Sequence, residues 1–195
     1  VETPDTWMQN GSTWLVPRTD KTFPVRFGGK VSEKWENGRL EIVYTDYDEV
    51  EAVPYDMMIS GSDCDAVSNL RLWKASDMRN FNMKLFTQGQ YMQAVEENTS
   101  AETLSRVLYP SDDHTEGKLL RLSQQYFLVS ASLQNILSDH IAVYGTLSNL
   151  PDKVAIHIND THPALCIPEL MRLLMDIYSF SWETAWDTVV KTVSY

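Results

Sequence analysis

The pattern of apolar and polar residues changes character near residue 80. In the first 75 residues glycine, proline and aromatic residues are frequent, and segments such as LEIVYTDY alternate, with Leu40, Ile42 and Tyr44 on one side. Strict alternation is typical of a half-buried β-strand, and Asn37 followed by Gly38 favours a two-residue hairpin turn. We therefore predict several antiparallel strands over residues 1–75.

Residues 76–195 carry mainly the period of a helix. The clearest predicted helix runs from about Gly117 to His140, because apolar residues recur there every three or four positions. Its predicted core face consists of Leu119, Leu122, Tyr126, Val129, Leu133 and Ile136. A last helix is predicted to begin near Ser181, a good N-cap residue. Its predicted apolar stripe consists of Trp182, Ala185, Trp186, Val189, Val190 and Val193.

One strand is predicted between these helices. The segment KVAIHIN, residues 153–159, is short and largely apolar, as expected for a strand covered on both sides. Pro163 and Pro168 suit the first turn of a following helix, ELMRLLMDIY. The predicted fold class is therefore α/β: an N-terminal antiparallel β-rich segment, then helices and a βα unit. We expect residues 1–195 to form one partial domain, β-rich over 1–75 and mainly helical over 76–195, with the strand at about 153–159.

Charge and cysteine content narrow the class of protein. Sixteen lysines and arginines against 27 acids give a formal charge of −11, which opposes binding to nucleic acid or anionic lipid. No apolar run reaches the roughly 18 residues of a membrane span, and the first residues lack the pattern of a signal peptide. Cys64 and Cys166 are too few for a disulfide framework. We predict a folded cytoplasmic protein without membrane or nucleic-acid partners.

A polar cluster, NDTHP, follows the predicted strand. In open α/β sheets ligands bind where strands end, so Asp160 and His162 are candidates for binding a polyol, or for proton transfer with the carboxylate orienting the imidazole. The alternative is structural: Asp160 or Thr161 caps the next helix, and His162 satisfies a loop backbone group. A metal site that adds His157 and Cys166 matches no standard ligand spacing, so no metal is predicted.

A second polar cluster, YPSDDHTEGK, covers Tyr109 to Lys118 and precedes the long predicted helix. Such a loop can act as a mobile acidic gate over a site. The alternative is a solvated connector in which Ser111 or Asp112 caps the following helix.

Five segments of the chain resemble, in the same order, the α-glucan phosphorylase family, which includes glycogen, starch and maltodextrin phosphorylases. They are LRLWKA (70–75), QYMQAV (90–95), LSRVLYPSDDHTEGKLLRLSQQYF (104–127), KVAIHINDTHPALCIPELMRLLMD (153–176) and WETAWDTVVKTVSY (182–195). The resemblance extends over essentially the whole chain. It implies an interior portion of the N-terminal domain, within a larger glycosyltransferase domain.

The resemblance implies a reaction for the full-length parent. Inorganic phosphate attacks the non-reducing end of an α-1,4-glucan and releases α-glucose 1-phosphate with retention, and pyridoxal 5′-phosphate takes part through its phosphate group. Nothing in this chain resembles the surroundings of the cofactor's lysine, and the family's phosphate-binding cluster also lies elsewhere. We therefore expect no catalytic residue and no bound cofactor in this fragment, and no activity from it alone. The alternative is a non-catalytic glucan-binding module that uses Tyr109 and surface tryptophans.

The same resemblance assigns roles to residues of both polar clusters. Asp160 and His162 match the lining of a side pocket beside the glucosyl subsite, and Tyr109 matches a tyrosine that lines the acceptor sugar subsites. The flexible gate loop of the family matches Ser111, Asp112, Asp113 and His114.

Two gate positions depart from the family pattern. Well-known members carry asparagines where this chain has Ser111 and Asp113. An ionised Asp113 accepts hydrogen bonds but cannot donate them, so any contact in which the asparagine donated to a sugar must change.

Two further segments bear on assembly and regulation. Residues 83–98 resemble the tower helix through which subunits of the family dimer contact each other. Animal members place two arginines for the phosphate of a nucleotide effector where this chain has Ser138 and Asp139. A hydroxyl and an anion do not attract phosphate, so we predict a homodimer that AMP does not activate.

Overall fold

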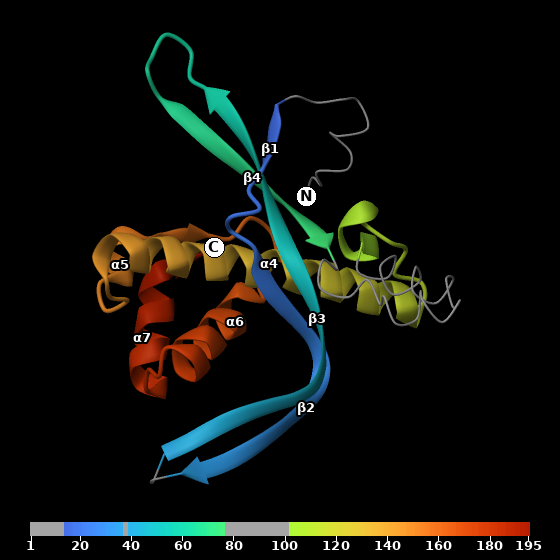
Figure 1. The fold of residues 1–195 in the computed structure, drawn as a ribbon, viewed down its shortest axis with the longest axis vertical. Helices are drawn as coiled ribbons and strands as arrows, with labels where there is room; N and C mark the ends of the chain where they lie inside the picture. Colours follow the sequence, from blue (N-terminus) through green and yellow to red (C-terminus); the bar gives the residue numbers. More distant parts are fainter. Residues whose placement is uncertain (1–13, 37–38, 77–101) are drawn as a thin grey trace. The chain divides into compact units, whose positions relative to one another are not determined.

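The computed structural model describes residues 14–36, 39–76 and 102–195 (Figure 1). Contacts between Cα atoms divide the chain into two compact units. The first unit comprises residues 1–25 and 49–124, and the second comprises residues 26–48 and 125–195. Each is described by itself below.

The N-terminal third forms a four-stranded sheet. Its strands are β1 (Leu15–Pro17), β2 (Phe23–Glu36), β3 (Arg39–Ser60) and β4 (Val67–Ser76). β3 lies between β1 and β2 in the strand order and also pairs with β4. β1 and β4 both run antiparallel to β3, which confirms the prediction of antiparallel strands. The predicted turn at Asn37 and Gly38 lies outside the described residues, directly between the end of β2 and the start of β3.

The apolar side chains of β3 and β4 form the core of the first unit. Ala52 pairs with Ala75 across the two strands, and both side chains are fully buried. Trp73 is buried as well and contacts Phe23 edge to face, with 6.0 Å between the ring centroids. The backbone N–H of Ala75 donates to the hydroxyl of Ser105 over 3.0 Å, which ties the end of β4 to the helical residues 102–106.

The long helix α4 (Thr115–Tyr144) is confirmed and extends beyond its predicted limits. Its predicted core face is wrong at the start, because Leu119 and Leu122 are 59% and 50% exposed. The buried positions begin with Gln124 and continue through Phe127, Val129, Ser130, Ala131, Leu133, Leu137 and His140. Apolar periodicity identifies the helix, but it does not show which of its turns are covered.

The core of the second unit is a cluster of buried side chains from α4 and the helices that follow it. These helices are α5 (Leu150–Lys153), α6 (Cys166–Arg172), the π-helical turn η1 (Leu173–Ile177) and α7 (Trp182–Thr192). Leu133, Leu150, Leu170 and Leu174 lie at the centre of this cluster, each at most 2% exposed. The helical character predicted for this part of the chain is confirmed.

The strand predicted at about 153–159 is much shorter in the structure. Lys153 ends α5, and only β5 (Ile156–His157) is a strand. It pairs in parallel with β6 (Val193–Ser194) at the end of the chain, and Ile158 extends this pairing by donating to the carbonyl of Ser194. The residues from Leu150 to Lys153 form a helix, so the start of the predicted strand is helical instead. The order strand then helix is nevertheless present, as β5 followed by α6.

Helix α7 begins as predicted, with Ser181 as its N-cap. The Ser181 hydroxyl accepts a hydrogen bond from the N–H of Thr184 over 3.2 Å. The predicted single stripe is wrong: Ala185 and Val189 are buried, together with Thr188 and Thr192, whereas Trp182, Trp186 and Val190 are exposed.

Residues 83–98, the predicted dimer contact, lie outside the described residues. Of the helices that the structure describes, none combines the length and apolar character that crossing a membrane requires.

Candidate functional site

The NDTHP loop connects β5 to α6 and has a tightly defined geometry. Asp160 has a φ of 63°, in the left-handed region. Its Oδ1 accepts a hydrogen bond from the N–H of Thr161 over 2.5 Å. Its Oδ2 lies 3.7 Å from Nδ1 of His162. The structure therefore brings the two predicted residues Asp160 and His162 side by side.

The loop does not serve as a cap for the helix that follows. α6 begins at Cys166, its N-cap position is Leu165, and no side chain caps it with a hydrogen bond. The interpretation of Asp160 or Thr161 as a helix cap is therefore wrong. Instead, backbone turns join the loop to the helix, since Ala164 donates to Thr161 and Cys166 donates to Pro163.

A carboxylate beside an imidazole is suited to a ligand rich in hydroxyl groups. The carboxylate accepts hydrogen bonds, and an imidazole can donate from one nitrogen while accepting at the other. The 3.7 Å separation of Asp160 Oδ2 and His162 Nδ1 is longer than a hydrogen bond. Asp160 is exposed and His162 is half-buried, so the loop is accessible to a solute.

The second predicted cluster forms a compact loop before α4. The hydroxyl of Ser111 donates to Oδ2 of Asp113 over 2.7 Å, and the Asp113 N–H lies 3.4 Å from the same hydroxyl. Asp112 Oδ2 accepts a hydrogen bond from Nη1 of Arg121 over 3.1 Å. Ser111 and Asp113, the two departures from the family pattern, therefore bond to each other.

Two backbone contacts fix the start of α4 against this loop. The carbonyl of His114 accepts from the N–H of Lys118 in the first helical turn. Gly117 approaches the loop so closely that an added Cβ would overlap the carbonyl oxygen of Ser111. The helix begins at Thr115, so His114 occupies the position directly before it. Ser111 and Asp112 therefore do not occupy the capping position that the structural alternative gave them.

Tyr109 is the most unusual backbone position of the predicted site. Its φ is 58°, and its side chain is 56% exposed. In the described part of the chain the other non-glycine residues with positive φ are Asp46, Asp63, Asp160 and Ser179. Aspartate enters this region more readily than most residues, whereas a bulky aromatic residue there is a true outlier. Such strain is found at functional sites when the surrounding structure enforces it.

The predicted residues fall into both units of the chain. Tyr109 and the loop residues 111–114 belong to the first unit, and Asp160 and His162 belong to the second. As predicted from the sequence, both polar clusters lie before helices, NDTHP before α6 and residues 109–114 before α4.

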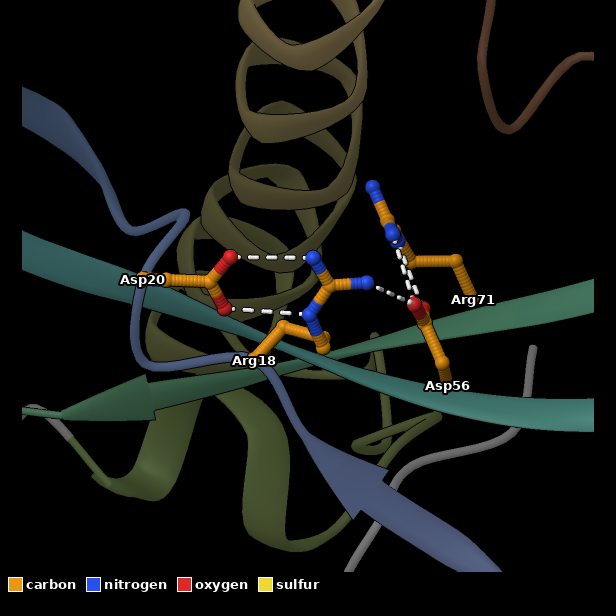
Figure 2. Close-up of polar contacts among 4 residues, drawn as sticks. All are labelled: Arg18, Asp20, Asp56 and Arg71. Atoms are coloured by element: carbon orange, nitrogen blue, oxygen red, sulfur yellow. Dashed lines mark hydrogen bonds and ion pairs between the residues drawn. The ribbon is translucent and has the colours of Figure 1, made fainter.

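A buried carboxylate in the first unit was missed by sequence reasoning (Figure 2). Asp56 is 2% exposed and accepts two hydrogen bonds of 2.7 Å each from Nε and Nη2 of Arg71. Arg18 adds a contact of 3.4 Å and forms two further bonds to Asp20. The Arg71 hydrogen bonds hold the pKa of Asp56 below its ordinary value, against the opposing effect of burial. A carboxylate with this many partners joins β3, β4 and the segment after β1, so its role is structural.

The sequence contains only a weak signal for this cluster. Asp56 is the one acid of the otherwise apolar stretch AVPYDMMI (residues 52–59) in β3, and Arg71 pairs with it directly across β3 and β4. This pairing depends on the register of the two strands, which the pattern of apolar and polar residues does not determine by itself.

A second network, also missed, surrounds Glu169 in the second unit. Glu169 is 4% exposed and forms two hydrogen bonds with Arg172, of 2.7 and 2.8 Å. Ser130 and Tyr126 of α4 donate to the same carboxylate over 2.7 and 3.3 Å. Hydrogen bonding to Glu169 raises the pKa of Arg172, and burial raises the pKa of Tyr126. We expect the positive charge of Arg172 to persist at any physiological pH.

The same unit holds a tyrosine bonded to a carboxylate. The hydroxyl of Tyr44 on β3 donates to Oδ2 of Asp176 in η1 over 2.6 Å. Burial, and then this hydrogen bond, raise the pKa of Tyr44 to about 12.

Neither a cluster of metal ligands nor a buried lysine occurs in the described part of the chain. Among the described residues, no three histidine, cysteine or acidic side chains lie close enough together to hold a metal ion. No described lysine is buried; these lysines are Lys21, Lys30, Lys34, Lys74, Lys118, Lys153 and Lys191.

A sequence comparison places the chain in a family. The family model described as carbohydrate phosphorylase matches residues 1–195, the whole chain. The chain belongs to the carbohydrate phosphorylase family. Glycogen phosphorylases of Haemophilus influenzae and Bacillus subtilis are 46% and 44% identical to it over 195 residues, and the muscle form of Mus musculus is 42% identical over 203. Each alignment includes the whole of this chain but only 23%, 23% and 24% of the length of the respective relative. The chain thus spans about a quarter of the length of these carbohydrate phosphorylases.

Proposed function

We propose that the full-length protein is an α-1,4-glucan phosphorylase that releases α-glucose 1-phosphate from glucan with inorganic phosphate. The observation that carries this proposal is the match of the whole chain to the carbohydrate phosphorylase family, with 42–46% identity to glycogen phosphorylases. Because the alignments include every residue of this chain at this level of identity, its polar loops and core helices share a common origin with those of the glycogen phosphorylases. The remaining three-quarters of such a protein supplies the catalytic groups.

In this proposal the NDTHP loop lines a side pocket beside the glucosyl subsite. Its support is the proximity of Asp160 and His162, together with the finding that neither Asp160 nor Thr161 caps α6. The carboxylate accepts from sugar hydroxyls, and the imidazole donates to or accepts from them.

Tyr109 lines the acceptor sugar subsites in the same proposal. An exposed aromatic face packs well on the apolar face of a glucose ring, and Tyr109 is 56% exposed. Its strained backbone, with φ at 58°, supports a functional role rather than a packing role.

The loop Ser111, Asp112, Asp113 and His114 acts as the gate of the catalytic cleft. Two polar contacts hold it in the observed conformation, Ser111 with Asp113 and Asp112 with Arg121. Both contacts are exposed and exposed pairs are weak, so the loop can open at small cost. The charge of Asp113 disfavours a nearby phosphate anion.

The cofactor and the assembly belong to the full-length protein. Pyridoxal 5′-phosphate supplies an acid/base phosphate group in the proposed reaction, and its lysine lies outside this chain. The protein works as a cytoplasmic homodimer with contacts from residues 83–98. It is not activated by AMP, because Ser138 and Asp139 offer a nucleotide phosphate no cation. The 195-residue piece has no activity by itself.

The test is phosphorolysis by the full-length protein, with glucose 1-phosphate measured in the presence and absence of inorganic phosphate. The proposal predicts release that depends strictly on phosphate. A protein that binds glucan but releases no glucose 1-phosphate would support the alternative of a glucan-binding module. Release of free glucose without phosphate would contradict both.

A further inference from the structure

Glu169 is a charged group enclosed in the core of the second unit, and both of its carboxylate oxygens are used. Oε1 accepts from Ser130 over 2.7 Å and from Nη2 of Arg172 over 2.8 Å. Oε2 accepts from Nε of Arg172 over 2.7 Å and from Tyr126 over 3.3 Å. A buried charge is unfavourable unless it is paired and hydrogen-bonded in this way. Glu169 therefore joins α6 to α4 through directional bonds.

The helix that carries Glu169 is continuous with the NDTHP loop. Ala164 donates to the carbonyl of Thr161, Cys166 donates to that of Pro163, and Glu169 itself donates to that of Leu165. These backbone bonds connect every turn between Thr161 and Glu169. Any rotation or shift of α6 is therefore passed on to the loop that holds Asp160 and His162.

Apolar packing alone does not determine how α6 is rotated about its axis. Leu170 and Leu174 attach the helical segment to the hydrophobic cluster, but apolar contacts are non-directional and tolerate small displacements. The bidentate bond with Arg172, on the same helix, fixes the Glu169 carboxylate within α6. The hydrogen bonds that Tyr126 and Ser130 donate to this fixed carboxylate then select one orientation of α6 on α4.

A second polar contact fixes the other end of the same segment. η1 follows α6 directly, and Asp176 within it accepts a hydrogen bond of 2.6 Å from Tyr44. π-helical turns of this kind are frequent at functional sites. The segment from Cys166 to Ile177 is thus held by carboxylates at two places.

We propose that Glu169 is a positioning residue for the sugar site: bonded to Tyr126 and Ser130, it fixes α6 and so holds Asp160 and His162 in their binding geometry. This inference rests on the proposed function, because the sugar site is assigned there. It adds a residue that touches no substrate and acts only through the loop.

The test uses the full-length protein and four variants. The double variant Tyr126→Phe with Ser130→Ala removes both hydroxyl donors of α4 but keeps the Glu169–Arg172 pair. It is made in the wild-type background and in a His162→Ala background, and kcat/KM for glucose 1-phosphate release is compared. Tyr144→Phe is the matched control, because it removes a hydroxyl from the same helix outside this network. Thermal unfolding is recorded for every variant.

A positioning role predicts coupling between the network and His162. The double variant should lower kcat/KM about tenfold in the wild-type background and less than about twofold when His162 is already alanine. The kcat/KM of Tyr144→Phe should stay within about twofold of the wild-type value. The double variant should change the unfolding midpoint by the same amount in both backgrounds. A purely structural role would lower kcat/KM by the same factor in both.

The two possible failures are distinguishable. Equal losses in both backgrounds would overturn the positioning role and leave the proposed function intact. If His162→Ala alone left kcat/KM unchanged, the site assignment itself would be wrong, and the positioning role would be wrong with it. Should the double variant give no folded protein, Tyr126→Phe alone carries the same comparison, with a smaller expected loss.

Discussion

Tyr109 and Asp160 share a backbone conformation that non-glycine residues seldom adopt, with φ at 58° and 63°. They lie in different units of the chain, and both are assigned to sugar binding in the proposed function. A left-handed backbone conformation destabilises the fold by about 1 kcal/mol at an ordinary residue. The penalty is smaller for aspartate, because its short side chain forms local hydrogen bonds. The carboxylate of Asp160 does so by accepting from the N–H of Thr161.

Two substitutions of Asp160 should therefore differ in their effect on stability but agree in their effect on substrate binding. Asp160→Asn keeps an oxygen that can accept from Thr161 and tolerates positive φ, so the unfolding midpoint of the full-length protein should change little. Asp160→Ala loses the acceptor and should cost about 1–2 kcal/mol. Removal of the charge beside His162 should weaken substrate binding in both variants. Differential scanning calorimetry and the KM for glucan measure the two effects, and equal stability of the two variants would contradict this account.

The loop of residues 111–114, which we propose as the gate, should be sensitive to a single methyl group at Gly117. In Gly117→Ala the new Cβ would meet the carbonyl oxygen of Ser111, so the loop has to move away from α4. Amide hydrogen exchange over residues 110–116 should become faster by about tenfold or more, because the loop loses its contact with α4, including the bond from Arg121 to Asp112. Lys118→Ala is the control, since Lys118 is exposed on the same turn. Unchanged exchange in Gly117→Ala would show that the loop is not fixed by this approach.

Much of the fold could be predicted from the sequence, because local patterns determine it. The alternating residues Leu40, Ile42 and Tyr44 lie in a strand, and the N-cap at Ser181 is where the residue type favours it. The positions of the two polar loops before α4 and α6 were also predicted, since clusters of polar residues and proline between periodic segments form turns.

The features that were missed depend on contacts between distant residues. The pairing of Asp56 with Arg71 needs the register of β3 and β4, and the Glu169 network needs the placement of α6 on α4. The exposure of Trp182 and Trp186 on α7 contradicts the predicted apolar stripe. Apolar periodicity identifies one face of a helix, but it does not show whether another element covers that face. The predicted strand at 153–159 is shorter because Leu150–Lys153 form a helix that the apolar pattern did not reveal.

Asp56 should make stability depend on pH in the acid range. Its pKa is lowered in the folded state, so its contribution is present above the unfolded pKa of about 3.9 and is lost as the pH falls through the lower folded value. Asp56→Asn leaves Arg71 without its charge partner and should cost about 3 kcal/mol at neutral pH. Urea unfolding should show this difference shrinking below about pH 4.

Asp20 provides the matched control for this measurement. It bonds to the same Arg18 but is 61% exposed, so Asp20→Asn should leave the urea midpoint nearly unchanged. A loss of stability that was equal for Asp20→Asn and Asp56→Asn would contradict the structural role of the buried pair.

Tyr44 should titrate well above ordinary tyrosines. Its pKa is raised to about 12, so its neutral form contributes stability that is complete below the unfolded pKa of about 10 and is lost as the pH rises towards the folded value. The phenolate absorbance of wild type minus that of Tyr44→Phe isolates this group. Asp176→Asn should lower the pKa only in part, because burial is the larger cause. A wild-type value near 10 would contradict the buried hydrogen bond.

The most direct test of the central claim compares two histidines five positions apart. His162 is assigned to the sugar site, whereas His157 is exposed on β5 beside Ser194. In the full-length protein, His162→Ala should lower kcat/KM for phosphate-dependent glucose 1-phosphate release by about tenfold or more, and His157→Ala should leave it within about twofold. Equal effects of the two substitutions, with both proteins folded, would contradict the assignment of the NDTHP loop to the sugar site.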